Sequence, residues 1–168
     1  RDIAAFHPNN VIELIDFLPS MTVIDYGGEG ATKSIRMRGS SPQQVLVTID
    51  GRPLNNQRDG LFDPNTIDLT NIERIEVIRG PASSLYGSNA VGGMINFITK
   101  QPSFKPQTKF VVKSGTFRTF AQEISHTQKI KNFGLFLSGR HQAQEGFRDN
   151  SDYKSYNLDN KFTLDLNQ

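Results

Sequence analysis

"IERIEVIRGPASSLYGSNAVGG", residues 72–93, decides the fold, because it places a strand, a chain break, a helical turn and a glycine pair in direct succession. Its first part alternates as a strand does: Ile75 and Val77 share a face with Arg79, and the residues between them share the other. Gly80-Pro81 then turns the chain out of the strand, since proline has no N–H to donate to a ladder. We therefore predict a sheet strand over residues 72–78.

The second part of this stretch predicts a reversal of the chain. "ASSLYG" is expected to form a short helical turn anchored by Leu85 and Tyr86. Gly92 and Gly93 follow, and glycine adopts the backbone angles that let a chain fold back at little steric cost. The run "GGMINFITK" then predicts a further strand.

Residues 10–18 predict a short amphipathic helix. Either Asn9 or Asn10 is a suitable N-cap, and Pro19 marks the end of the helix. Apolar side chains recur at helical spacing, which predicts one buried stripe. That stripe contains Val11, Leu14, Ile15 and Leu18.

The segment after this helix contains two further strand signals. Val23 and Ile24 begin one strand, and a glycine-rich loop separates it from "SIRMRG". In "QVLVTIDGRPL", apolar residues occupy both faces, which predicts a strand buried on both sides. Asp50-Gly51 is a turn signal, and "NNQRDG" continues as a polar loop.

A different regime begins near Thr108, where four runs alternate for strand-length stretches: "KFVVKSGTF", "TFAQEISHTQKI", "FGLFLSGRHQ" and "SYNLDNKFTLDL". A turn at Lys131-Asn132 and a longer link at residues 146–150 separate them. Phe133, Leu135 and Leu137 share one face, as do Leu158, Phe162, Leu164 and Leu166 in the last run. Such alternation is typical of transmembrane barrel strands and of any half-buried antiparallel strand. The pattern alone favours a soluble meander.

Composition and motifs exclude most kinds of chemistry. The net charge is +2, which gives no reason to expect nucleic acid as a partner. Cysteine is absent, so disulfides and thiolate chemistry are excluded, and no apolar run approaches the roughly 20 residues of a membrane-spanning helix. His7, His126 and His141 lack the spacing of metal ligands. No dinucleotide fingerprint, nucleophile elbow or acid–base set is present, so we expect neither an enzyme nor a bound cofactor or metal.

Arg38 in "RMRG" and Arg79 in "VIRGP" have similar contexts, because each precedes a glycine at the end of an apolar strand. In one interpretation, both side chains extend to solvent from strand ends. In the other, both are enclosed and need carboxylate partners, since an unpaired buried charge is costly. Asp50, Glu73 and Glu76 are candidates within the chain, and an external wall is another source.

"SIRMRGSSPQQVLVTIDGRPLN" followed by "IERIEVIRGPASSLYGSNAVGGMINFITK" resembles the plug domain of TonB-dependent outer-membrane receptors. The resemblance covers residues 11–100 in order, including the spacing between the two Arg-Gly elements. Further on, "GTFRTF" and "FLSGRHQAQEGFRDNSDYKSYNLDNKFTLDL" are similar to the first strands of the family's barrel. One departure is Pro19-Ser20, where the family usually has Pro-Gly.

The resemblance implies an α+β plug domain, a small mixed β-sheet with short helices, over residues 1–101. Antiparallel strands of an incomplete transmembrane β-barrel would follow over residues 102–168. The family's barrels have about 22 strands and lie in the outer membrane of Gram-negative bacteria. At about ten residues a strand such a barrel needs roughly 220 residues, so we expect a fragment with a whole plug and about four barrel strands.

The resemblance also implies a transport mechanism. Receptors of this family bind a scarce nutrient, such as an iron-siderophore, haem or cobalamin, and the plug gates the barrel lumen. TonB, energised by its ExbB–ExbD complex, pulls on a TonB box near the receptor's N-terminus. That box is expected upstream of Arg1, where we also expect the N-terminus to have been processed or trimmed. The expected partners are thus TonB, the nutrient and outer-membrane lipid.

Site residues follow from the resemblance position by position. Arg38 and Arg79 match the plug arginines that pair with barrel carboxylates and lock the plug in place. In the family the loop after the Asp-Gly turn contacts substrate, and residues 27–32 are a second candidate loop. The first loop contains Asn55, Asn56, Gln57, Arg58 and Asp59. The expected hinges and turns are Gly39, Asp50, Gly51, Gly80, Pro81, Tyr86, Gly87, Gly92 and Gly93.

An alternative of a different class is a self-contained secreted β-sheet module for binding or adhesion. The two hypotheses differ in the reading frame that surrounds this segment. A receptor needs several hundred residues of alternating strands downstream, and a signal peptide with a TonB box upstream. A secreted module needs neither.

Overall fold

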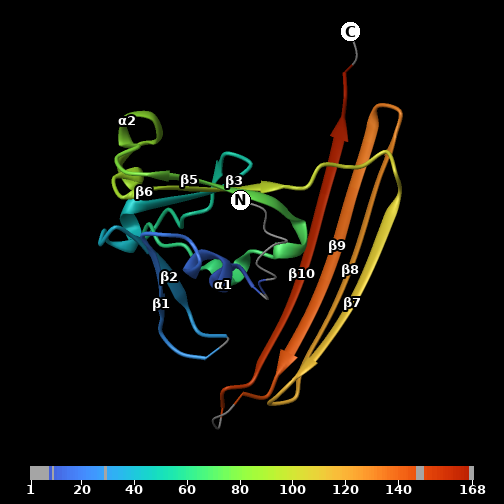
Figure 1. Cartoon of the computed structure of the whole chain (residues 1–168), viewed down its shortest axis with the longest axis horizontal. Coiled ribbons are helices and arrows are strands. Elements are labelled where there is room, and N and C mark those ends of the chain that lie inside the picture. The colour runs from blue at the N-terminus through green and yellow to red at the C-terminus, as the bar shows by residue number, and fades with distance from the viewer. Residues whose placement is uncertain (1–7, 9, 29, 147–149, 167–168) are drawn as a thin grey trace. The chain divides into compact units, whose positions relative to one another are not determined.

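The computed structural model describes residues 8, 10–28, 30–146 and 150–166. Contacts within the chain divide it into two compact units. Figure 1 draws both and colours the chain by residue number. Unit 1 comprises residues 1–27 and 31–99, and unit 2 comprises residues 28–30 and 100–168. His7, the alternative cap Asn9 and residues 147–149 of the predicted link lie outside the described residues.

Unit 1 begins with helix α1, Val11–Asp16. Asn10 is its N-cap, and the Asn10 side chain accepts a hydrogen bond of 2.9 Å from the Glu13 amide. Three members of the predicted stripe are buried, and Leu18 packs against the core from just beyond the helix end. The predicted helix is therefore confirmed, although it ends two residues early, because Phe17 is its C-cap.

Two sheets complete unit 1. Strands β1, Met21–Asp25, and β2, Lys33–Met37, form an antiparallel pair. The second sheet has the strand order β4-β3-β6-β5, in which β3 and β6 are parallel. Its members are β3 Val45–Ile49, β4 Arg52–Pro53, β5 Ile72–Arg79 and β6 Gly93–Thr99. Helix α2 spans Ser83–Tyr86, and 3-10 turns span Pro42–Gln44, Pro64–Thr66, Leu69–Asn71 and Ser88–Ala90.

Strand β3 is buried on both faces, as its sequence predicts. The four residues 45–48 are between 1% and 5% exposed. Asp50 and Gly51 then adopt φ angles of 48° and 80°, which places Arg52 opposite Ile49 in a tight hairpin. The predicted alternation of β5 is also confirmed, because Ile75 and Val77 pack against the core.

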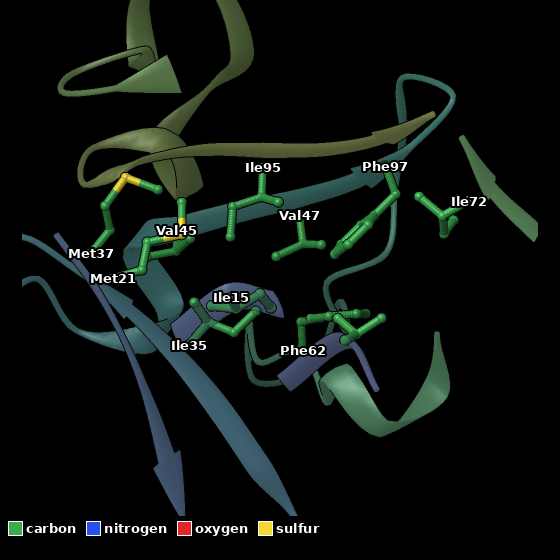
Figure 2. Packing of buried hydrophobic residues seen from close by; sticks show 11 residues of the cluster. Ile15, Met21, Ile35, Met37, Val45, Val47, Phe62, Ile72, Ile95 and Phe97 are labelled. Carbon is green, nitrogen blue, oxygen red and sulfur yellow. The ribbon is translucent and has the colours of Figure 1, made fainter. Parts of the chain in front are cut away.

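The core of unit 1 lies between the larger sheet, the β1–β2 pair and helix α1. Figure 2 shows Val47, Ile95 and Phe97 from β3 and β6 facing Ile15 of α1 and Phe62. Ile95, Phe97 and Ile15 have no exposed surface. Burying each such side chain contributes about 1.5–3 kcal/mol to folding, so this cluster dominates the stability of the unit.

A smaller cluster holds the turn around α2. It consists of Leu46, Ala82, Ala90 and Met94, and the Ala82 amide donates a 2.9 Å hydrogen bond to the carbonyl of Ala90. The helical turn is present as predicted, but Tyr86 is 46% exposed and does not anchor it. The side chain of Leu85 lies outside the described residues. Among the side chains that the structure describes, Ala82 and Ala90 are the ones by which this turn packs on the sheet.

Unit 2 is a four-stranded antiparallel sheet in the order β10-β9-β8-β7, drawn from yellow to red in Figure 1. The strands are β7 Gln107–Gly115, β8 Thr119–Ile130, β9 Phe133–Gln144 and β10 Tyr153–Leu164. Each predicted alternating run is therefore a strand. Among the described residues, the helices are too short or too polar to span a bilayer.

The exposed face of this sheet is the apolar one. On this "apolar face" Leu158 is 86% exposed, Tyr156 75% and Phe110 64%. The opposite "polar face" carries a Glu123–Arg140 ion pair of 3.5 Å whose side chains are 13% exposed. A soluble meander would bury the first face and expose the second, so the preference from alternation alone is wrong. Apolar side chains outward and polar side chains inward is the arrangement of a membrane barrel wall. The apolar face also contains Val112, Phe120, Ile124, Ile130, Phe133, Leu137, Phe162 and Leu164.

Candidate functional site

The two Arg-Gly elements meet at one corner of unit 1, which we call the arginine corner: Arg38, Gly39, Arg79 and Gly80. Arg38 and Gly39 follow β2 with φ angles of 51° and 76°, and Gly80 follows β5 with a φ of 123°. The Nη1 atom of Arg38 lies 3.8 Å from the point where a Cβ would stand on Gly80. The fold therefore brings together two arginines that are far apart in the sequence.

Gly92 and Gly93 make this close approach possible. A Cβ on Gly93, whose φ is 144°, would overlap the sulfur of Met37 and the carbonyl oxygen of Ile78. The Gly92 amide donates a 2.8 Å hydrogen bond to the carbonyl of Gln44, and a Cβ there would overlap the Ser40 side chain. Both glycines thus hold the end of β2 against the β5–β6 ladder, which positions the corner.

Within the described residues, the two corner arginines have exposed side chains and no ion-pair partner. The three acids that the sequence offered lie elsewhere. Asp50 accepts hydrogen bonds from the amide and hydroxyl of Thr99 at 2.9 and 2.6 Å. Glu73 and Glu76 lie 3.8 and 3.0 Å from Arg74. Because both arginines are charged and neither has a neutralising carboxylate among the described residues, the corner is suited to an anionic partner.

The loop of residues 55–59, the "polar loop", is held by Asn55. The Asn55 Oδ1 atom accepts a 2.7 Å hydrogen bond from the amide of Val47. Its Nδ2 atom donates to the carbonyls of Val45 at 3.0 Å and Gly60 at 2.9 Å. The side chain therefore continues the pairing of β3 beyond the end of β4, and its hydrogen-bonding groups are used inside the protein. Asn55 supports the loop.

The remaining residues of the polar loop are exposed. Asn56 and Asp59 accept hydrogen bonds of 2.9 Å from the amides of Arg58 and Leu61, two residues further along in each case. These local bonds give the loop a defined shape. They leave the side chains of Gln57 and Arg58 exposed and without a hydrogen bond among the described residues, so the donor groups of both side chains face solvent.

An ion pair that the sequence analysis missed closes the β1–β2 hairpin. The Nζ atom of Lys33, whose side chain is 5% exposed, lies 2.6 Å from Oδ2 of Asp25. The hydrogen bond from Lys33 lowers the pKa of Asp25, partial burial opposes it, and the Gly27 amide lowers it further. A lowered pKa means that the pair stabilises the fold above the ordinary pKa of an aspartate and that this contribution is lost on acidification. The sequence does contain a signal for this pair: an acid ends the first strand of a hairpin and a lysine begins the second, so the two residues face each other.

The described part of the chain offers no metal-binding cluster of histidine and acidic residues. His126 instead shares a 2.8 Å hydrogen bond with Thr108, and the ring of His141 stacks on Tyr156 at 4.7 Å. The arrangement that does exist is a cationic corner, a shaped polar loop and a sheet with an exposed apolar face. Each of these features offers a surface for contact with another molecule, through charge, hydrogen-bond donors or apolar area.

Known proteins with similar sequences and folds are outer-membrane receptors and transporters. The vitamin B12 transporter BtuB of Vibrio cholerae is 35% identical over 158 residues, which cover 94% of this chain and 24% of the transporter. The receptor FpvA of Pseudomonas aeruginosa with bound pyoverdine superposes with a TM-score of 0.81 at 23% identity, covering 98% of this chain and 22% of the receptor. The copper transporter OprC has a TM-score of 0.77 at 18% identity, covering 95% and 26%.

These comparisons cover the chain almost completely, whereas the chain spans only about a quarter of the curated relatives it matches. The two structural similarities are below 25% identity and concern the fold alone. A sequence profile described as "TonB-dependent Receptor Plug Domain" matches residues 1–94, which is more than half of the chain. The chain therefore belongs to the family of TonB-dependent receptor plug domains, whose proteins are outer-membrane transport receptors and not enzymes.

Proposed function

We propose that residues 1–101 are the plug, and residues 102–168 the first barrel strands, of an outer-membrane receptor that imports a scarce nutrient. TonB, with its ExbB–ExbD complex, would supply the energy through a TonB box upstream of Arg1. One observation carries the proposal: a plug-family domain continues directly into strands whose large apolar side chains are the exposed ones. That combination suits a plug joined to its membrane wall and does not suit a secreted adhesion module.

Cobalamin is the first candidate nutrient. Its support is the 35% identity to a vitamin B12 transporter, which includes the plug and the following strands. An iron-siderophore is the second candidate, supported by the fold similarity to a pyoverdine receptor. Arg58 and Gln57 of the polar loop offer donors to either ligand, since amides and guanidinium groups bind both phosphate and carboxylate or hydroxamate oxygens.

An uptake assay tests the function and ranks the two nutrients. The full-length receptor that contains this segment is expressed in cells that lack their own vitamin B12 and siderophore receptors. We expect saturable uptake of radiolabelled cyanocobalamin that disappears in cells without TonB. Uptake of ferric pyoverdine but not cyanocobalamin would reverse the ranking. Uptake of neither, or uptake that does not need TonB, would contradict the proposal.

We also propose that the arginine corner binds carboxylates of the barrel wall and so locks the plug. Replacing both Arg38 and Arg79 with glutamine removes the two charges and leaves shorter side chains that are still polar. We expect a looser plug, measured as faster hydrogen exchange of β5 and β6 and as entry of a large antibiotic that the closed receptor excludes. Breaking charge pairs that are enclosed against a wall is strongly destabilising, by about 3 kcal/mol each.

The matched control for this double variant replaces Arg36 and Arg52 with glutamine; both are exposed arginines of the same unit that do not belong to the corner. This control changes the net charge equally, so it separates a general charge effect from the loss of a lock. Equal antibiotic entry in both double variants, or no change in either, would rule out the lock.

A further inference from the structure

The apolar face of unit 2 contains a hollow centred on Gly139. Its volume is about 330 Å³. Phe110, Ile124 and Leu158 line it, and these residues stand in the same register row as Gly139 across the four strands. The three side chains are more than half exposed, so the hollow opens toward whatever surrounds the apolar face.

The backbone does not require a glycine at position 139. Gly139 is not among the residues with a positive φ. A Cβ there would stand 3.4 Å from Cδ2 of Leu158 and 3.7 Å from Cγ2 of Ile124, which are ordinary contact distances. The gap is therefore a surface feature that a side chain would fill without strain. Glycine inside a strand often marks a place where a ligand approaches the backbone closely.

One end of the hollow is polar. His141 and Tyr156 stack there at 4.7 Å, and Tyr156 is 75% exposed. In the next row outward, Lys154 lies opposite Ala143, is exposed, and has no ion-pair partner among the described residues. This end of the sheet leads to the longer link at residues 145–152, whereas the short turn at Lys131-Asn132 lies at the opposite end.

These features orient the hollow in a membrane. In outer-membrane barrels the longer loops face outside, and aromatic residues gather at the membrane–water interfaces. A lysine at that level extends its ammonium group toward the lipid head groups. The hollow is thus an apolar groove within the hydrocarbon layer, and its polar end lies at the level of the outer leaflet's head groups.

We propose that this groove binds one acyl chain of a phosphorylated glycolipid of the outer leaflet, the lipid A class. The acyl chain lies over Gly139 between Ile124 and Leu158, and a phosphate of the glycolipid contacts Lys154. The groove is continuous with the surface that faces the bilayer, and its cation matches an anionic head group. The inference goes beyond nutrient transport, and it requires only that β7–β10 face the membrane.

The test uses the full-length receptor, purified from outer membranes in mild detergent and examined by native mass spectrometry. Gly139→Leu fills the groove. Ser114→Leu is the control, because it places the same side chain on the apolar face of β7, at an exposed residue that neither lines the groove nor pairs with the strand of Lys154. Lys154→Gln removes the proposed phosphate contact, and its exposed position makes it a second variant should Gly139→Leu not be recovered.

We expect the native receptor and Ser114→Leu to retain one lipid A adduct. Gly139→Leu should reduce its occupancy about tenfold, which corresponds to about 1.4 kcal/mol of binding free energy. Lys154→Gln should reduce it several-fold. Equal lipid A adducts in the native receptor and in the recovered groove variants would overturn the proposal, as would a retained glycerophospholipid in place of lipid A.

Discussion

Replacing Gly93 with alanine is expected to lower the free energy of opening of the plug sheet by about 3 kcal/mol. Two effects add. The φ of 144° at Gly93 is unfavourable for any residue with a side chain, and the new Cβ would overlap the carbonyl oxygen of Ile78 and the sulfur of Met37. A methionine side chain can move, but a carbonyl inside the β5–β6 ladder cannot move without breaking the pairing of Arg79 with Gly93.

Hydrogen-exchange mass spectrometry of the full-length receptor measures this opening, through peptides from β3 and β6. Gly39→Ala is the matched control. Gly39 also has a positive φ, of 76°, but a Cβ there would meet no atom within 4 Å. We expect Gly39→Ala to lower the free energy of opening only by the cost of a positive φ for a residue with a side chain, about 1 kcal/mol. If the two variants open equally easily, the close packing at Gly93 does not hold β2 against the sheet.

Single helices and strands of the plug could be predicted where the spacing of apolar residues and a residue that ends the element, such as proline or Asp-Gly, indicated the same boundaries. The stripe of α1 and the two-sided burial of β3 are examples, since both depend on side-chain spacing alone. Tyr86 was a wrong prediction for the anchor of α2, because this large side chain is 46% exposed, whereas the small Ala82 and Ala90 are buried on the sheet. The size of side chain that fits between a helix and a sheet depends on the shape of the sheet surface. The spacing of apolar residues in the sequence does not reveal that shape.

The alternation in unit 2 predicted strands but could not predict which face is exposed. A soluble half-buried strand and a membrane barrel strand have the same period of two. The exposed fraction separates them, because Leu158 and Phe162 face outward while Asp159 and Lys161 are partly covered. The sequence resemblance, and not the periodicity, pointed to the correct alternative.

The arginine corner was predictable only as two similar local contexts. Their meeting depends on the close approach at Gly92 and Gly93, which joins segments distant in the sequence. The alanine variant of Gly93 should therefore also disturb the corner, because Arg38 directly follows the Met37 that packs there. This expectation links the stability of the sheet to the proposed lock.

Replacing Asn55 with alanine is expected to destabilise the polar loop by about 2–3 kcal/mol. The substitution removes three hydrogen bonds and leaves the amide of Val47, a residue that is 1% exposed, without its acceptor. An unsatisfied buried donor costs about 1–3 kcal/mol, and the two lost donations from Nδ2 add to that. Hydrogen exchange at Val47 should therefore become faster by about two orders of magnitude.

Arg58→Ala is the comparison for Asn55→Ala, because the Arg58 guanidinium is exposed and has no hydrogen bond among the described residues. The two variants together distinguish a residue that supports the loop from one that contacts the ligand. Arg58→Ala should leave exchange at Val47 unchanged and weaken binding of the transported nutrient if the polar loop contacts it. Asn55→Asp keeps the acceptor for Val47 but cannot donate, so it should fall between alanine and the native residue. Unchanged exchange in Asn55→Ala would refute the supporting role. Unchanged affinity in Arg58→Ala would remove this arginine from the ligand site and leave Gln57 as the remaining donor of the loop.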